Sequence, residues 1–375
     1  MRSLAFISLA LTLGIVQTAT AQPVNTMTRN VYLGASLGPA IGVADLPALV
    51  AATGEILREV DSNEFPTRAE GLAQEILETK PDLIGLQEVA WWRTAPVKYE
   101  VLDPRVGPSA TDTRYDYLEE LLGHLNQHKQ EYEVVVVQEE FDFEAPADED
   151  PDIVNGPYGA DINGRLTMRD VILARSKAYV QTWNEQGENF ANLLPLPITM
   201  DPPTFVDVVR GRTATDARVR GSEPFRFVNT HLEAFHPGVR AQQAGELVEA
   251  GGPATSDLPV ILVGDLNSDD DTVTGADRLA YLALLAAGMV PISTDEPLSC
   301  CLNSSLLGEN DGGDITDFDH QVDHIMTRDP YNVFLRHSEV TGLEPVNGFW
   351  NSDHAGVFSA LRLLRVWPPA FEMQP

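Results

Sequence analysis

The sequence predicts a single large α/β domain built from short buried strands and amphipathic helices. Apolar, β-branched runs recur along the chain, and most of them end in polar or ionisable residues. Helical periodicity lies between some of these runs, and no linker, repeat or low-complexity segment separates them. Hydrophobic residues make up 43% of the 375-residue chain, which is enough for a sizeable core. We therefore expect residues 22–375 to form one domain.

Three segments have the spacing of amphipathic helices. Apolar residues recur at helical intervals from Leu46 to Val60 and again in TRAEGLAQEILETK, residues 67–80. Pro81 is expected to end the second helix. A third helix is predicted near VRAQQAGELVEA, residues 239–250.

Strands are predicted where β-branched and aromatic residues cluster between turn residues. The predicted strands are DLIGLQEV (82–89), YEVVVVQ (132–138), DVILAR (170–175), TFVDVVR (204–210), FRFVNTHL (225–232), VILVGD (260–265), VDHIMT (322–327) and GVFSALRL (356–363). This pattern alone does not distinguish a doubly wound sheet from two packed sheets. In open α/β sheets, ligands and catalytic groups gather where such strands end.

The first 21 residues are typical of a signal peptide. Arg2 precedes an apolar stretch from Leu4 to Val16, and Ala19 and Ala21 form a small-residue cleavage site. No later segment has the roughly 18 unbroken apolar residues of a membrane-spanning helix. We expect cleavage near Ala21 and a soluble protein that is secreted or periplasmic.

Charge and cysteine content limit the function further. The chain carries 25 Lys and Arg against 56 Asp and Glu, a net charge of -31, which repels polyanions in general and argues mildly against a nuclease without excluding one. Cys300 and Cys301 are the only cysteines. A disulfide between neighbours in sequence is strained, so two ordinary cysteines near a loop are favoured over a redox role, and their redox state stays open.

The segment VILVGDLNSDDDTVTG, residues 260–275, resembles the start of a calcium-binding loop. Its alternating polar residues are Asp265, Asn267, Asp269 and Asp271. An EF-hand loop also needs Gly at its sixth position, Glu at its twelfth and a helix before it. Here those positions hold Asp270 and Ala276, and an apolar strand precedes them. On this segment alone, a catalytic carboxylate, a calcium loop and a polar turn all remain open.

Similar residues recur at the ends of other strands. The set is Asn30, Glu88, Asp170, His231, Asp265, Asn267, Asp323, Asp353 and His354. Together these residue types provide what hydrolysis of a phosphate ester needs: hard oxygen ligands for a cation, a carboxylate and an amide to orient water, and imidazoles to neutralise charge. The sequence has no G-x-S-x-G, P-loop, GxGxxG or HExxH motif, so water is the expected nucleophile.

Five motifs occur in an informative order: PDLIGLQEV, NTHLE, VGDLN, VDHI and SDHAGV. In this order they resemble the endonuclease/exonuclease/phosphatase superfamily, which includes pancreatic-type deoxyribonuclease, abasic-site endonucleases, bacterial sphingomyelinases and inositol-phosphate phosphatases. The resemblance runs from about Met27 to about Leu364. It implies a four-layer α-β-β-α sandwich of two packed, mostly antiparallel sheets, with the strand ends meeting at one cleft.

The resemblance also implies a metal site. Glu88 corresponds to the principal metal ligand, Asn30 lies near it, and Asp353 resembles a second acidic group on the metal side. These ligands suit Mg²⁺, with Mn²⁺ or Ca²⁺ as alternatives.

The remaining residues are expected to act on the phosphate and the water. Asp265 and Asn267 resemble the pair that orients and activates the water, with Asp269 to Asp271 a solvated continuation. His354 resembles the imidazole that contacts the phosphoryl group, held by Asp323. His231 resembles a phosphate ligand and leaving-group acid, and Asp170 is a candidate partner for it.

The substrate stays open between nucleic acid and a phospholipid headgroup or small phosphoester. The favoured function is an exported, metal-dependent phosphodiesterase of the nuclease type, acting as a monomer. The alternatives are a sphingomyelinase-like or inositol-phosphate-type hydrolase and a non-catalytic binding protein. A cationic patch on the predicted hairpin would favour nucleic acid; its members are Arg210, Arg212, Arg218, Arg220 and Arg226. Trp91 and Trp92 have a stacking role or pack internally, and the sequence shows no long exposed hydrophobic hairpin.

Overall fold

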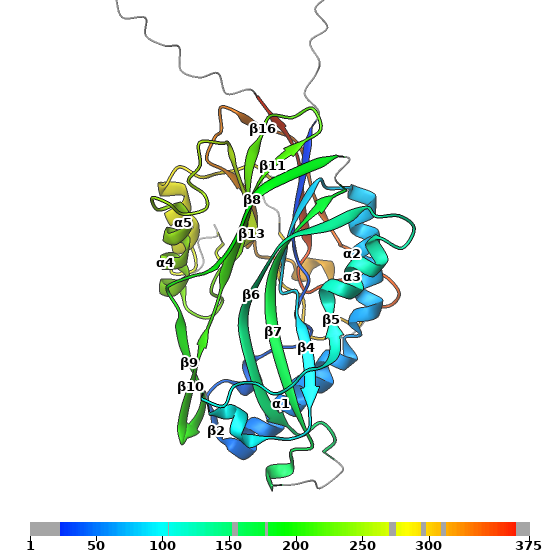
Figure 1. The fold of residues 1–375 in the computed structure, drawn as a ribbon, viewed down its shortest axis with the longest axis vertical. Helices are drawn as coiled ribbons and strands as arrows, with labels where there is room; N and C mark the ends of the chain where they lie inside the picture. The colour runs from blue at the N-terminus through cyan, green and yellow to red at the C-terminus, as the bar shows by residue number, and fades with distance from the viewer. Residues whose placement is uncertain are drawn as a thin grey trace, which may run out of the picture.

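Two packed sheets form the centre of the molecule, and helices cover their outer faces (Figure 1). The computed structural model describes residues 23–103, 105–151, 157–176, 179–269, 275–293, 298–308 and 313–364. The predicted signal peptide and the acidic residues Asp270 and Asp271 lie outside the described residues. Among the described helices, none has both the length and the apolar character needed to cross a membrane.

The first sheet has eight strands. In spatial order they are β16 (Val333–Thr341), β17 (Gly356–Leu363), β1 (Val24–Asn30), β3 (Leu83–Gln87), β7 (Ile162–Arg175), β4 (Trp91–Ala95) and β5 (Asp112–Asp116), with β6 (Tyr132–Ala147) paired to β7. Helices α1 (Leu46–Ser62), α2 (Phe65–Thr79) and α3 (Tyr117–Leu125) pack on its outer face.

The second sheet has six strands, and a smaller sheet lies beside it. The six-stranded order is β14 (Val290–Pro291), β15 (Asp323–Thr327), β13 (Val260–Asp265), β12 (Phe225–His231), β11 (Gly211–Val219) and β8 (Val180–Asn189). Helices α4 (Pro237–Val248) and α5 (Leu279–Ala286) cover its outer face. The three-stranded sheet consists of β10 (Pro203–Val208), β9 (Leu194–Asp201) and β2 (Val43–Asp45). Short 3₁₀ helices span Gly38–Ala40 (η1), Tyr99–Leu102 (η2), Pro157–Gly159 (η3) and Ile315–Asp317 (η4).

The four layers follow from which side chains each strand buries. In β13, Val260 and Leu262 pack against α4 and α5, whereas Ile261 and Val263 pack between the two sheets. A strand buried on both faces needs apolar residues at every position, which is why this segment is wholly apolar. The sheets come very close at Gly85, where a Cβ atom would lie 2.4 Å from Oδ1 of Asn229 on the facing strand.

The predicted α-β-β-α sandwich is confirmed, and most strand pairs are antiparallel. All three predicted helices and all eight predicted strands are present, several with extended ends. Helices α3 and α5 and strands β2, β4, β5, β8, β9, β14 and β16 were not predicted from the sequence.

Strand register places the polar residues at one end of the second sheet. His231 pairs with Asp265 across the parallel β12–β13 ladder, and Asp265 pairs with Asp323 across the antiparallel β13–β15 ladder. In the first sheet, the parallel β1–β3 ladder pairs Asn30 with Gln87, directly before Glu88. The fold therefore brings residues from distant parts of the chain to the same edge.

Candidate active site

Asp265 lies at the centre of the cluster. Its Oδ2 accepts a hydrogen bond from Nδ2 of Asn30 at 3.0 Å and lies 3.4 Å from Nε2 of His231 and 3.8 Å from Nε2 of His354. Its Oδ1 accepts from the backbone N–H of Asn267 at 2.8 Å. One carboxylate thus faces two imidazoles and an amide.

Asn267 holds the turn that follows β13. Its φ of 47° is left-handed, a conformation that Asn tolerates better than most residues, and its Nδ2 donates to the carbonyl of Leu232 at 2.9 Å. Burial raises the pKa of Asp265 to about 6, and the neighbouring Asp323 raises it too, while His354 and hydrogen bonds oppose the shift. The Asp265 carboxyl is therefore a stronger proton acceptor than an exposed one.

His354 and Asp323 form a buried pair. Nδ1 of His354 lies 2.8 Å from Oδ2 of Asp323, which also accepts from the hydroxyl of Ser299 at 2.6 Å. Because a carboxylate accepts, Nδ1 carries a proton and Nε2 faces Asp265. Burial lowers the pKa of His354, but the carboxylates of Asp323, Asp353 and Asp265 outweigh it and hold this pKa well above its usual value. The cationic imidazole is the favoured form at neutral pH.

His231 has the opposite environment. Nδ1 of His231 lies 3.1 Å from Nη1 of Arg210. Since a guanidinium only donates, Nδ1 must accept, and the ring proton is on Nε2, which faces Asp265. Burial, Arg210 and His354 all lower the pKa of His231 well below its usual value. This imidazole is therefore neutral and donates from Nε2.

Asp170 does not pair with His231 as the sequence suggested, because Arg210 occupies Nδ1 of His231. Asp170 is fully buried, and its carboxyl group shares a hydrogen bond with the carboxyl group of Glu140. Burial and the adjacent Glu140 raise the pKa of Asp170 well above its usual value, and burial raises the pKa of Glu140 to about 8. Both acids interact electrostatically with Arg210, which in turn contacts His231.

Glu88, Asn30 and Asp353 are the residues that the sequence predicts to bind a cation, and this role stays a prediction. Oε2 of Glu88 accepts from the backbone N–H of Leu33 at 2.8 Å, and Oε1 lies 3.9 Å from Nε2 of His231. Burial raises the pKa of Asp353 to about 7, and Glu88 contributes to this shift. Two carboxylates that repel each other, together with a nearby amide oxygen, are a set of oxygen donors that fits a hard divalent cation. Separately, ligand atoms of Asp265, Asp323 and His354 lie within 4.8 Å of one another and could also hold a metal ion.

Arg68 supports the loops around the site, a role that the sequence did not indicate. This buried residue of α2 donates to the carbonyls of Asn63, Val31 and Asn351 at 2.9, 2.9 and 3.0 Å. It ties the loop after Asn30 to the loop before Asp353. A single buried Arg in a helix carries no sequence signal for such a contact.

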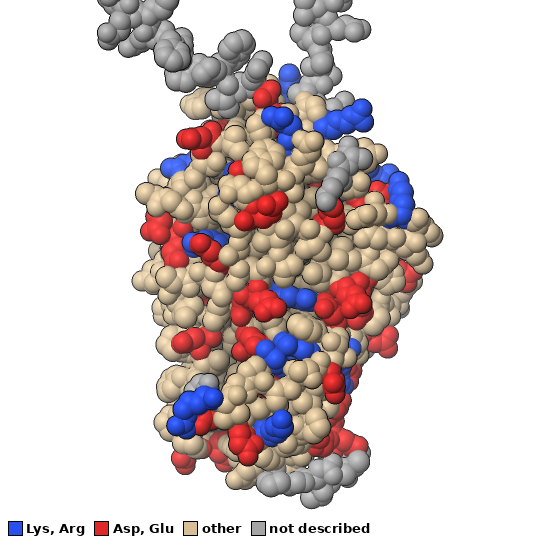
Figure 2. All heavy atoms as spheres, in the orientation of Figure 1, with Lys and Arg blue, Asp and Glu red and all other residues tan. Residues whose placement is uncertain are grey.

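The expected cationic patch is mostly internal. Arg210 and Arg226 are buried, and Arg226 pairs with Asp216 at 3.0 Å. Arg212 pairs with Glu188 at 2.8 Å, which leaves Arg218 and Arg220 exposed on the hairpin. Figure 2 shows one face of the molecule, where acidic and basic side chains are interspersed without a continuous basic surface.

Asp269 is not a solvated continuation of the motif. Its side chain is only 8% exposed and accepts from the backbone N–H of Gln321 at 3.0 Å. Asp270 and Asp271 lie outside the described residues.

Trp92, the β9–β10 hairpin and the two cysteines were also subjects of expectations from the sequence. Trp92 is buried, and its Nε1 donates to the carbonyl of Leu33 at 2.8 Å, so it packs internally. The β9–β10 hairpin exposes the hydrophobic side chains of Met200 and Phe205, which are 59% and 62% accessible, although the sequence indicated no long exposed hydrophobic hairpin. A disulfide joins Cys300 and Cys301, whose redox state the sequence left open.

Two packed sheets whose strand ends gather carboxylates, an amide and two imidazoles define a phosphoesterase-type sandwich. The sequence profile of the endonuclease/exonuclease/phosphatase family matches residues 30–354, and the chain belongs to this family. Members of the family are hydrolases that act on phosphoesters. Among curated proteins, none matches the chain significantly in sequence.

Solved structures share the fold at low identity. A functionally unknown protein from Enterococcus faecalis is 13% identical with a TM-score of 0.50, over 91% of this chain and 100% of that one. An endonuclease/exonuclease/phosphatase from Bacteroides vulgatus is 16% identical with a TM-score of 0.49, over 91% and 99%. A mannosyl-6-phosphatase from Bacteroides thetaiotaomicron is 14% identical with a TM-score of 0.48, over 90% and 99%.

Proposed function

We propose that the protein is a divalent-metal-dependent phosphodiesterase that uses an activated water. The observation that carries this proposal is the position of Asp265 between a cationic imidazole, His354, and a neutral one, His231. A non-catalytic binding protein has no need for two histidines held in opposite protonation states around one carboxylate.

In the proposed reaction, the water oxygen bonds to phosphorus while the bond from phosphorus to the leaving oxygen breaks. Asp265 takes the proton from the water, and Asn267 helps to orient it. The His354 cation stabilises the charge that grows on the phosphoryl oxygens. His231 donates a hydrogen bond from Nε2 to the phosphate. A neutral imidazole has no acidic proton to give at neutral pH, so the leaving oxygen takes its proton from solvent.

A bound Mg²⁺ would polarise the phosphoryl oxygens and offset their charge. Glu88, Asp353 and Asn30 are the residues that would hold it, since their oxygens are hard ligands. Too few protein oxygens are present among them to enclose a cation fully, which suits Mg²⁺ with retained waters.

The test is hydrolysis of bis-p-nitrophenyl phosphate with Mg²⁺ and with EDTA. We expect turnover that EDTA abolishes and that Asp265→Asn lowers by at least a hundredfold. Asp257→Asn, a change at an exposed acid just before the same strand, is the matched control and should keep full activity. Activity that persists in Asp265→Asn would contradict the mechanism, and its absence in a folded, Mg²⁺-loaded wild type would favour a binding protein.

We also propose that the protein is exported. The support is the charged residue, apolar stretch and small-residue site within residues 1–21. N-terminal sequencing of protein recovered from outside the cytoplasm should begin near Gln22. An intact Met1 in that fraction would contradict the proposal.

A further inference from the structure

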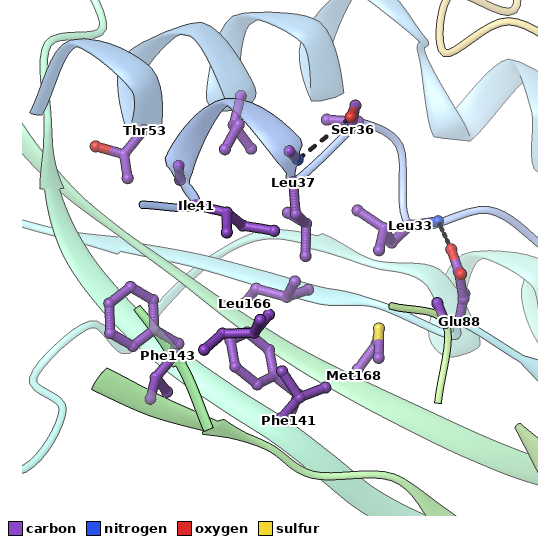
Figure 3. A pocket seen from close by; sticks show the side chains of 18 of the residues that line it. Leu33, Ser36, Leu37, Ile41, Thr53, Glu88, Phe141, Phe143, Leu166 and Met168 are labelled. Carbon is purple, nitrogen blue, oxygen red and sulfur yellow. Dashed lines mark hydrogen bonds between the residues drawn. The ribbon is translucent and has the colours of Figure 1, made fainter. Parts of the chain in front are cut away.

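A largely apolar cavity adjoins the catalytic cluster. It has a volume of about 380 Å³, within the range of small-molecule sites. Figure 3 shows Phe141, Phe143 and Leu166 on one side, Leu37 and Ile41 on the other, and Glu88 at one end. The cavity and the proposed metal site therefore share a wall.

Three parts of the fold enclose this cavity. Strands β6 and β7 form the floor with alternate residues such as Phe141 and Phe143, or Leu166 and Met168. The loop through η1 and one face of α1 form the opposite wall, and the β9–β10 hairpin contributes Leu196 and Val206. The small sheet of β2, β9 and β10 thus helps to build a compartment beside the main sandwich.

Several polar side chains along the body of the cavity already have hydrogen-bond partners in the protein. The Thr53 hydroxyl bonds to the carbonyls of Leu49 and Pro146 at 2.9 and 2.6 Å. The Ser36 hydroxyl accepts from the backbone N–H of Gly38 at 3.3 Å. Nε1 of Trp92 donates to the Leu33 carbonyl at 2.8 Å. A base or a sugar would bury polar atoms here without partners, which is costly, whereas a hydrocarbon would not.

Polar groups suited to a phosphate lie at the catalytic end. Glu88, Asp353 and Arg210 line the same cavity and belong to, or contact, the cluster around Asp265. A ligand with an anionic, metal-binding head and an apolar tail matches this distribution.

We propose that the cavity binds the hydrocarbon chain of an amphiphilic phosphodiester while its phosphate lies at the catalytic cluster. The proposal rests on the proposed function and names its substrate class: a monomeric phosphodiester with an alkyl or acyl chain. The cavity then determines specificity, because each methylene that enters it leaves water.

The experiment compares alkyl p-nitrophenyl phosphodiesters that carry methyl, butyl, hexyl and octyl chains, each below its aggregation concentration, with Mg²⁺. Burial of one methylene contributes about 0.8 kcal/mol, so kcat/KM should rise by about two- to fourfold per methylene until the cavity is full. Octyl phosphate should likewise inhibit at least tenfold more strongly than methyl phosphate. Chain-length independence in both series would overturn the proposal.

A substitution inside the cavity separates this site from the catalytic cluster. Val206→Trp places a large ring in the cavity from the hairpin, and it should flatten the chain-length series, so that kcat/KM of the octyl diester falls toward that of the methyl diester. The matched control is Phe205→Trp, which changes the exposed neighbour on the same strand. In this variant the dependence of kcat/KM on chain length should match that of the wild type. A Val206→Trp protein with the full wild-type series would contradict the proposal.

The two proposals fail differently. If the methyl diester is hydrolysed and Asp265→Asn abolishes this, but chain length has no effect, only the cavity proposal is lost. If no diester is hydrolysed, yet octyl phosphate binds much more tightly than methyl phosphate by calorimetry, the cavity proposal stands and the catalytic one falls. If Val206→Trp does not fold, the two wild-type series still decide the outcome.

Discussion

Arg210 donates a hydrogen bond to Nδ1 of His231 across 3.1 Å and so determines which nitrogen of that ring carries its proton. Nε2 then presents an N–H toward Asp265 and the phosphate site. The other histidine has the reverse arrangement, since Asp323 accepts the proton on Nδ1 of His354. One site thus contains two imidazoles with different fixed roles.

In Arg210→Met, the ring proton of His231 should no longer be restricted to Nε2. Without the guanidinium, the proton can move to Nδ1, and kcat should fall about tenfold or more while KM changes less. Nitrogen chemical shifts of the His231 ring report the tautomer directly, which a purely structural role would not alter. Arg212→Met, two residues along and paired with Glu188, is the control. An unchanged His231 spectrum in Arg210→Met would refute the positioning role.

His354→Ala should lower kcat by on the order of 10² to 10⁴, because a positioned acid-base group is lost. The melting temperature should fall as well, because Asp323 loses its buried partner, so activity is compared per amount of folded protein. His337→Ala, at an exposed histidine of β16, should leave both quantities unchanged. If His354→Ala lowers the melting temperature while specific activity survives, the histidine has only a structural role.

Glu88→Gln should weaken the cation site with little loss of fold. The carboxylate accepts from the Leu33 N–H, and the Gln carbonyl oxygen retains that acceptor while losing the charge that binds Mg²⁺. We expect the Mg²⁺-induced rise in melting temperature to disappear along with activity. Glu119→Gln, on an exposed face of α3, should retain both. A full Mg²⁺ response in Glu88→Gln would exclude this residue as a ligand.

Asp82 should make stability depend on pH. Burial raises its folded-state pKa to about 6, against hydrogen bonding from Asn25 and the charge of Arg175, whereas the unfolded value is about 3.9. A raised pKa means that the contribution to stability is complete below about pH 4 and is lost as pH rises through 6. Two pKa units correspond to about 3 kcal/mol at most.

Asp82→Asn removes this titration. Relative to wild type, the unfolding free energy of the variant should therefore increase by up to about 3 kcal/mol between pH 4 and pH 8. Urea unfolding at both pH values measures the difference. A constant offset between the two proteins would show that Asp82 does not titrate in this way.

Local sequence patterns were sufficient for the main elements and for the ends of strands. The apolar run before Asp265 requires burial on both faces, and its last residue must then lie at a sheet edge. In the helix from Leu46, apolar residues recur at the helical period and form one buried face. The local pattern and the tertiary packing therefore favour the same structure.

Contacts between distant segments were not predictable in the same way. Arg210 reads as a surface charge on a hairpin, and only the packing of β11 against β6 and β7 shows that it is buried beside Glu140 and His231. Asp269 reads as solvated because its partner, the backbone N–H of Gln321, is 52 residues away. The cavity also depends on the β9–β10 hairpin, and the sequence pattern of each of its strands is only a weak signal for a strand.

Leu33 contacts both Glu88 in the catalytic cluster and the apolar cavity. Its N–H binds Glu88, while its carbonyl accepts from Nε1 of Trp92 at 2.8 Å and from the hydroxyl of Tyr117 at 3.0 Å. Its side chain lines the cavity. A hydrocarbon chain bound in the cavity, as proposed above, would therefore contact the residue whose backbone holds Glu88, the proposed metal ligand. By thermodynamic linkage, if a bound hydrocarbon chain changes the affinity for the cation by some factor, the bound cation changes the affinity for the hydrocarbon chain by the same factor.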